Sequence, residues 1–99
     1  MPKVMFTISY GIKPEVREQY LALIQDMKNH LTTVGKKNYS VFEAKGKKNQ
    51  FSEVFETASL EEFDALEDNQ DEKTEQLISK LEEFVDDNGM KYSTLVEIG

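Results

Sequence analysis

Residues 38–57 read NYSVFEAKGKKNQFSEVFET and decide the fold. Two strand-like runs, 38–45 and 50–57, lie on either side of Gly46-Lys47-Lys48-Asn49. Glycine and asparagine tolerate the positive φ that a hairpin turn requires. The stretch therefore predicts an antiparallel hairpin in the middle of the chain.

A strand and a helix are predicted before this hairpin. Residues 3–10 alternate so that every second side chain is apolar, which predicts a strand that ends at Gly11. Pro14 suits a first helical position, and Gly35 suits the residue after a helix. Between them apolar residues recur at steps of three and four, which predicts a helix of about five turns: Val16, Tyr20, Leu23, Ile24, Met27, Leu31 and Val34.

The chain after the hairpin predicts more helix and a last strand. Residues 59–62 (SLEE) form a capping box, in which the serine side chain and the last glutamate cap each other's backbone N–H. Asn69 with Glu72 repeats this spacing, so we expect a break near Gln70 and a second helical stripe that Gly89 ends. Residues 90–98 alternate again and predict a strand.

The element order strand, helix, hairpin, helix, strand predicts an α+β fold of βαββαβ order. Such an order gives a four-stranded antiparallel sheet with its helices on one face. Apolar residues such as Phe42 and Val54 fall on the phase opposite to Tyr39 and Phe55, so the far face of the sheet is not strictly polar. We expect a second copy to cover it as a homodimer, and the alternative is a monomer with scattered surface aromatics.

Composition limits the classes of function. The 99 residues fit one domain, 1–99, and their net charge of -7 is unfavourable for nucleic-acid binding. Lys45, Lys47 and Lys48 form one basic cluster, which is either a solvated turn or a phosphate site. There is no cysteine and no apolar run long enough for a membrane span. We therefore expect a cytoplasmic protein that binds neither membranes nor nucleic acid.

Three stretches carry a resemblance to a known superfamily: Lys13-Pro14-Glu15, the run FSEVFE at 51–56, and the run SLEEF at 59–63. With the element order, they resemble the ferredoxin-like dimeric α/β-barrel superfamily, which includes the antibiotic biosynthesis monooxygenases. The resemblance covers nearly the whole chain. It implies that two sheets face each other in a dimer, around a barrel interior that can hold a small ligand.

The resemblance also implies which activities the chain lacks the residues for. Haem-degrading relatives use a histidine after the third strand, with a tryptophan and an asparagine, and this chain has no tryptophan and only His30. Cofactor-free monooxygenase relatives place tryptophan, asparagine and tyrosine around a polyphenol, and only the tyrosine can be matched here. Acylphosphatases need an arginine and a glycine-rich loop that residues 9–13 do not supply. We expect no cofactor.

Three residues are candidates for chemistry. His30 is the only histidine and either titrates near neutral pH in a site or fills space beside the helix stripe. Glu53 shares a phase with Phe51 and Phe55, so it is either a carboxyl with a raised pKa inside the barrel or an exposed charge paired with a lysine. Tyr10 ends the first strand, where relatives bind ligand, or it only packs.

Other carboxylates give no metal site. Glu43 and Glu56 lie on predicted strands and are either carboxyls that point into the barrel, as for Glu53, or exposed charges that pair with Lys45 or Lys91. The acidic residues of 61–87 lack the regular oxygen spacing and central glycine of a calcium loop, so a solvated face is expected. Three hypotheses remain: a protein that binds a small apolar or aromatic molecule, a cofactor-independent monooxygenase-like enzyme, and a structural or protein-interaction module.

Overall fold

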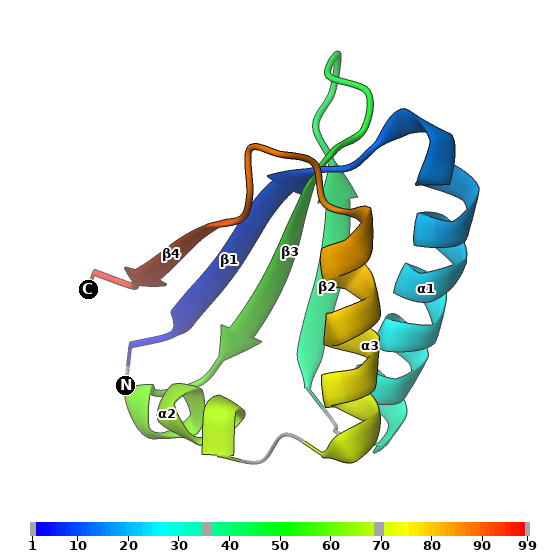
Figure 1. Cartoon of the computed structure of the whole chain (residues 1–99). Helices are drawn as coiled ribbons and strands as arrows, with labels where there is room; N and C mark the ends of the chain where they lie inside the picture. The colour runs from blue at the N-terminus through cyan, green and yellow to red at the C-terminus, as the bar shows by residue number, and fades with distance from the viewer. Residues whose placement is uncertain (1, 35–36, 69–70, 99) are drawn as a thin grey trace.

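The computed structural model describes residues 2–34, 37–68 and 71–98 (Figure 1). These residues form one antiparallel sheet in the order β2-β3-β1-β4. The strands are β1 (Val4–Gly11), β2 (Asn38–Glu43), β3 (Gln50–Thr57) and β4 (Lys91–Val96). The helices are α1 (Arg17–Asn29), α2 (Leu60–Asp68) and α3 (Glu72–Phe84). A 3-10 turn at Pro14–Val16 precedes α1, and a π turn at His30–Val34 follows it. The predicted α+β, βαββαβ order is confirmed.

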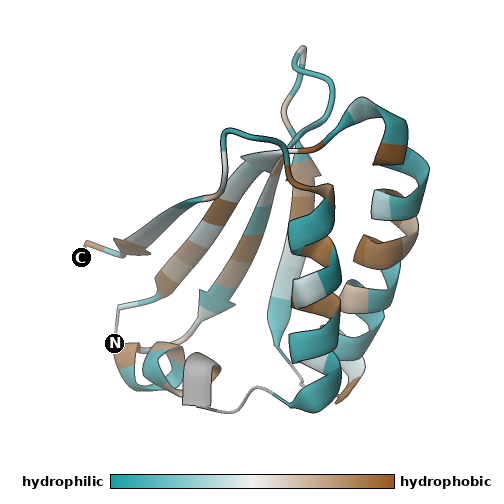
Figure 2. Cartoon of the chain, viewed as in Figure 1, coloured by the Kyte–Doolittle hydropathy of each residue, from teal (hydrophilic) through white to brown (hydrophobic). Residues whose placement is uncertain are grey.

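The helices α1 and α3 cover one face of the sheet (Figure 1). They lie over β2 and β3, whereas β4 is the edge strand farthest from them. Figure 2 shows apolar and polar bands that alternate along β1 and β3, as a sheet with two different faces requires. The buried core between helices and sheet contains residues from both predicted stripes: Tyr10, Ile12, Tyr20, Leu23, Met27, Leu31, Tyr39, Phe51 and Leu81.

The central hairpin forms as predicted, but β2 is shorter than expected. It ends at Glu43 rather than at residue 45, and the Ala44 N–H donates to the carbonyl of Gln50 at 2.8 Å. Gly46 has φ 80° and Asn49 has φ 68°, the left-handed values for which these residue types were expected. The turn chemistry therefore positions both strands and the register between them.

Capping residues set the starts of α2 and α3. The Ser59 hydroxyl accepts from the Glu62 N–H at 3.2 Å, but the Glu62 carboxylate accepts from the N–H of Ala58, not of Ser59. Asp71 caps α3 by accepting from the Thr74 N–H at 2.8 Å. Asn69, expected as that cap, and Gly35, expected to close the first helix, lie outside the described residues.

Part of the sheet surface is left without cover in one chain. On the face away from the helices, Phe42 is 59% exposed and Leu95 is 53% exposed. Tyr92, on the helix side of β4, is 64% exposed because α1 and α3 do not reach this edge strand. No helix in the described part of the chain has the length and apolarity needed to cross a membrane.

Candidate functional site

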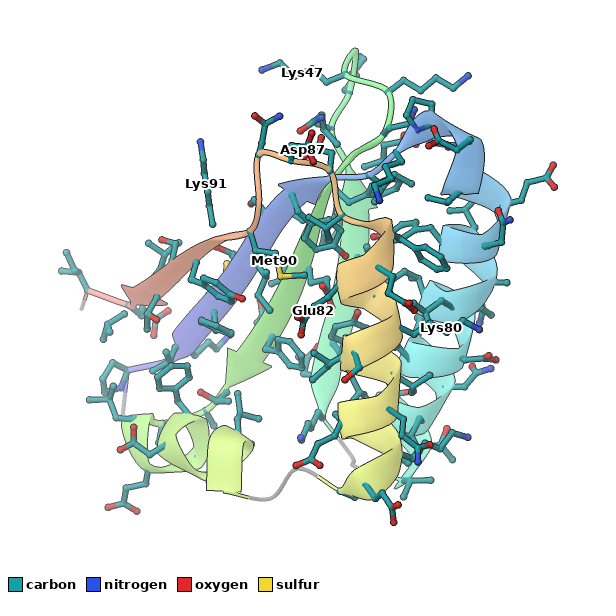
Figure 3. The ribbon with its side chains drawn as sticks, viewed as in Figure 1. Lys47, Lys80, Glu82, Asp87, Met90 and Lys91 are labelled. Atoms are coloured by element: carbon teal, nitrogen blue, oxygen red, sulfur yellow. The ribbon has the colours of Figure 1, made fainter. Side chains whose placement is uncertain are left out.

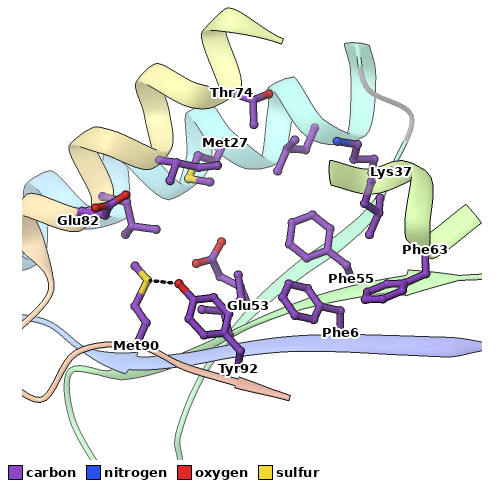
Figure 4. A pocket seen from close by; sticks show the side chains of 15 residues that line it. Phe6, Met27, Lys37, Glu53, Phe55, Phe63, Thr74, Glu82, Met90 and Tyr92 are labelled. Atoms are coloured by element: carbon purple, nitrogen blue, oxygen red, sulfur yellow. Dashed lines mark hydrogen bonds between the residues drawn. The ribbon is translucent and has the colours of Figure 1, made fainter. Parts of the chain in front are cut away.

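A pocket of about 300 Å³ lies between the sheet and the helices (Figure 4). Its floor comes from β1, β3 and β4 and its roof from α1, α2 and α3, with Met90 at the side. Most of its wall is apolar: Phe6, Ile8, Met27, Leu31, Phe55, Phe63, Leu66, Ile78, Leu81, Met90 and Tyr92. Pockets of this size and lining are typical of small-molecule sites.

The position of the pocket differs from the expected one. The resemblance implied a cavity between the facing sheets of two copies, on the side of the sheet away from the helices. This pocket lies on the opposite side of the sheet and is formed by residues of one chain. The helices α1 and α3 stand over β2 and β3, and their side chains, with Phe63 and Leu66 of α2, enclose the pocket against β1, β3 and β4.

Phe6 is the centre of an aromatic wall in this pocket. Its ring centroid lies 6.3 Å from that of Phe55 and 5.7 Å from that of Phe63. On its other side the ring of Tyr92 stacks at 6.2 Å with an interplanar angle of 17°. These separations are in the range of favourable aromatic pairs, so the wall presents ring faces and edges to whatever enters.

Glu53 is the one deeply buried carboxyl of the described residues. It lies on β3, opposite Ile8 of β1 and Val41 of β2, and only 1% of it is exposed. Its Oε1 accepts a hydrogen bond of 2.5 Å from the Tyr39 hydroxyl. No described residue hydrogen-bonds to its Oε2, and Figure 4 shows the carboxyl pointing into the pocket.

The protonation of Glu53 follows from this environment. Burial raises the pKa of the Glu53 carboxyl, and the hydroxyls of Tyr39 and Tyr10 oppose that rise. Burial, followed by the charge of Glu53, also raises the pKa of Tyr10 and Tyr39 well above the usual range. The two phenols therefore keep their protons at neutral pH and remain donors.

Two charged side chains line the pocket beside Glu53. Glu82 comes from α3 and Lys37 from the segment before β2, and they stand at opposite ends of the pocket (Figure 4). Figure 3 shows Glu82 on the side of α3 that faces the sheet, near Met90. Lys47 instead points away from the body of the protein at the hairpin tip, which agrees with the solvated turn.

Of the three sequence candidates, Glu53 alone lines the pocket. Tyr10 is 4% exposed and its hydroxyl shares a 2.7 Å hydrogen bond with the hydroxyl of Tyr20 in the core. His30 lies at the end of α1, where its Nε2 is 2.8 Å from Oδ2 of Asp71. The side chains therefore do not converge on one pocket.

Glu43 pairs with a residue that the sequence did not suggest. The expected partners were Lys45 or Lys91, but Nη1 and Nη2 of the Arg17 guanidinium donate to its carboxylate, at 2.6 and 2.9 Å. Arg17 and the Asn49 N–H together lower the pKa of Glu43 to about 2. This pair lies outside the pocket.

Metal binding finds no support in the described residues. Within 2–34, 37–68 and 71–98, no three His, Asp or Glu side chains gather closely enough to hold an ion. The polar pocket residues missed from the sequence were Lys37, Thr74 and Glu82. Lys37 has the phase of Tyr39, and Glu82 lies four residues after Ile78, but a single charged residue at such a position does not differ in the sequence from an ordinary surface charge.

Comparison with solved structures places this fold among known ones. A conserved protein from Methanosarcina mazei Go1 aligns with a TM-score of 0.80 at 12% identity, over 96% of this chain and 92% of that one. A proposed antibiotic biosynthesis monooxygenase from Caulobacter crescentus CB15 aligns with a TM-score of 0.80 at 10% identity, over 99% and 92%. SnoaB, a cofactor-independent oxygenase from Streptomyces nogalater, aligns with a TM-score of 0.73 at 6% identity, over 94% and 90%.

These similarities confirm the predicted resemblance at the level of fold. The chain has the ferredoxin-like fold that antibiotic biosynthesis monooxygenase-like structures share. No protein-family model and no curated protein matches the sequence. Identities this low show the fold alone.

Proposed function

We propose that this protein binds a small apolar or aromatic molecule in the pocket between its sheet and its helices. The observation that carries the proposal is the cavity of about 300 Å³ behind an aromatic wall, with one buried carboxyl inside. Apolar walls supply affinity by removing ligand surface from water, and a few polar groups fix orientation. A catalytic role for Glu53, Tyr10 or His30 stays a prediction.

Titration with N-phenyl-1-naphthylamine, a neutral apolar dye whose fluorescence rises out of water, tests this proposal. We expect saturable one-site binding to the wild type. Ile78→Trp, which adds a large ring to the pocket wall, should weaken binding at least tenfold. Ser79→Trp, the next residue of α3 and exposed, is the matched control and should bind as the wild type does. Equal binding by both variants would place the dye elsewhere and contradict the proposal.

We also propose that the protein forms a homodimer through the face of the sheet away from the helices. Phe42 and Leu95 are more than half exposed there, and Met5 and Val54 lie between them on the same face. An apolar patch on a sheet is commonly covered by a symmetric copy. A cytoplasmic location, expected from the sequence, is part of the same proposal, and cell fractionation checks it.

Sedimentation equilibrium tests the dimer. The wild type should sediment as twice the mass of one chain, and Phe42→Glu should shift it to monomer by adding a charge to the interface. Leu21→Glu makes the same change at an exposed position of α1 and should remain dimeric. A monomeric wild type at all concentrations would contradict the proposal.

A further inference from the structure

Glu53 has a free acceptor oxygen where the pocket is otherwise apolar. The carboxyl is 1% exposed, Tyr39 occupies only Oε1, and within the described residues Oε2 has no hydrogen-bond partner. A buried polar atom without a partner is unfavourable by more than a typical hydrogen bond contributes. The pocket therefore favours a ligand that brings a donor to this oxygen.

The charges around the pocket determine whether a cationic or an anionic ligand is favoured there. Glu53 lies inside the pocket and Glu82 on its wall, whereas the single lysine of the lining, Lys37, stands at the end opposite to Glu82. The whole chain has a net charge of -7. This distribution attracts cations and repels carboxylates or phosphates from the centre of the pocket.

The aromatic wall suits a cation as well. The rings of Phe6, Phe55 and Tyr92 line the same pocket as the Glu53 carboxyl, and ring faces attract ammonium groups. Carboxylate and ammonium form the stronger, charge-assisted kind of hydrogen bond. An aromatic body carrying an amine would thus satisfy both parts of the site.

We infer that the ligand is an organic amine, an apolar or aromatic body bearing a protonated nitrogen that donates to Oε2 of Glu53 and so keeps the buried carboxyl ionised while it is bound. This inference rests on the proposed function, because it specifies the ligand class of the same pocket. The nitrogen lies beside Glu53, and the body extends along Phe6 toward Phe55 and Phe63.

Three probes with one aromatic body test the inference by calorimetric titration at neutral pH. They are 1-naphthylmethylamine, which is a cation, 1-naphthalenemethanol, which is neutral, and 1-naphthoate, which is an anion. We expect the wild type to bind the amine at least about tenfold tighter than the alcohol, as charge-assisted hydrogen bonds allow, and the anion most weakly.

Two isosteric variants test whether the buried carboxyl causes the preference for the amine over the alcohol. Glu53→Gln should weaken the amine at least about tenfold and leave the alcohol within about threefold of wild type, which also reports that the pocket is intact. Glu43→Gln removes a carboxylate from the same face of the sheet but outside the pocket, and should bind all three probes as the wild type does.

The outcomes separate the inference from the proposed function. Equal binding of amine and alcohol, or an amine affinity that Glu53→Gln does not change, would overturn the amine inference while the pocket remains a binding site. If the amine, the alcohol and N-phenyl-1-naphthylamine all fail to bind to the wild type, the proposed function itself fails. The comparison of probes on the wild type needs no variant, so a poorly folded Glu53→Gln does not weaken it.

Discussion

Glu43 and Glu53 lie on neighbouring strands and on the same face of one sheet, yet their environments are opposite. Glu43, at the hairpin end, accepts two hydrogen bonds from Arg17 and one from the Asn49 N–H, and its pKa falls to about 2. Glu53, in the interior of β3, accepts a hydrogen bond from the Tyr39 hydroxyl at Oε1, its Oε2 has no hydrogen-bond partner among the described residues, and burial raises its pKa.

The difference shows what separates a structural carboxylate from a candidate site. Glu43 holds α1 to the hairpin through a complete set of donors, so it has little left to offer a ligand. Glu53 is placed in an apolar pocket with one oxygen unused, a condition that proteins tolerate mainly where the group has another role.

The largest expected effect is on the pH dependence of stability through Glu53. Its pKa in the folded protein is raised above the ordinary 4.5, so the folded state holds the proton more tightly. This contribution is full below pH 4.5 and is lost as the pH rises through the raised pKa, by up to about 1.4 kcal/mol for each pH unit. Glu53→Gln should remove this loss and flatten the curve of unfolding free energy against pH, measured by urea denaturation.

Other titratable or charged groups lie near Glu53 or line the same pocket, and their contribution to the slope of the unfolding free energy against pH has to be separated from that of Glu53. They are Tyr10 of β1, Tyr20 of α1, Tyr39 of β2, Tyr92 of β4, Glu82 of α3 and Lys37 before β2. The pKa values of Tyr10, Tyr20 and Tyr39 are raised, chiefly by burial, so these phenols do not titrate near neutral pH. Glu82→Gln is the control and should keep the wild-type slope. A slope that survives in Glu53→Gln would assign it to another group.

A smaller effect is expected from Tyr39→Phe. This change removes the hydroxyl that donates to Oε1 of Glu53. It should therefore lower the free energy of unfolding by about 1 kcal/mol. It should also raise the pKa of Glu53 further, seen by carbon-13 NMR of the carboxyl. Tyr92→Phe removes an exposed hydroxyl from the same face and should change neither quantity. Equal destabilisation by both variants would mean that the bond to Glu53 contributes nothing specific.

The sequence predicted the periodic part of this molecule and only part of the site. Alternation placed Glu53 on the same face as Phe51 and Phe55, and that phase is the reason it was a candidate at all. Periodicity could not tell that Tyr39 would occupy only one of its oxygens, because that depends on the register and side-chain geometry of the hairpin. It could not tell that Arg17 would cross to Glu43, because this contact joins the first helix to the hairpin. It also could not tell on which side of the sheet a cavity remains, since that depends on how far the helices reach over β4.

A still smaller effect on stability is expected from Arg17→Gln, because this pair is exposed to solvent. Glu43 has a lowered pKa, so its contribution is present above pH 4.5 and is lost as the pH falls toward 2. Without Arg17 the pKa of Glu43 should rise from about 2 toward its ordinary value, which a carboxyl NMR titration measures directly. Glu18→Gln, an exposed change on the same helix, should leave that pKa alone. An unchanged value in Arg17→Gln would show that the Asn49 N–H and the charge of Lys48 set it.

The smallest effect is expected at Asp71. Like Glu43, this carboxylate accepts hydrogen bonds that lower its pKa. The side chain and N–H of Thr74, and then His30, hold its pKa well below the usual range. Its contribution is therefore present above pH 3.8 and is lost as the pH falls below it, and Asp71→Asn, which keeps a capping oxygen but no charge, should lower the urea midpoint at neutral pH by the charge's share alone. Asp71→Ala removes the cap and should lower that midpoint further than Asn does. If Asn and Ala lower it equally, then the carboxylate's pairing with His30, rather than the cap, holds the start of α3 against the end of α1.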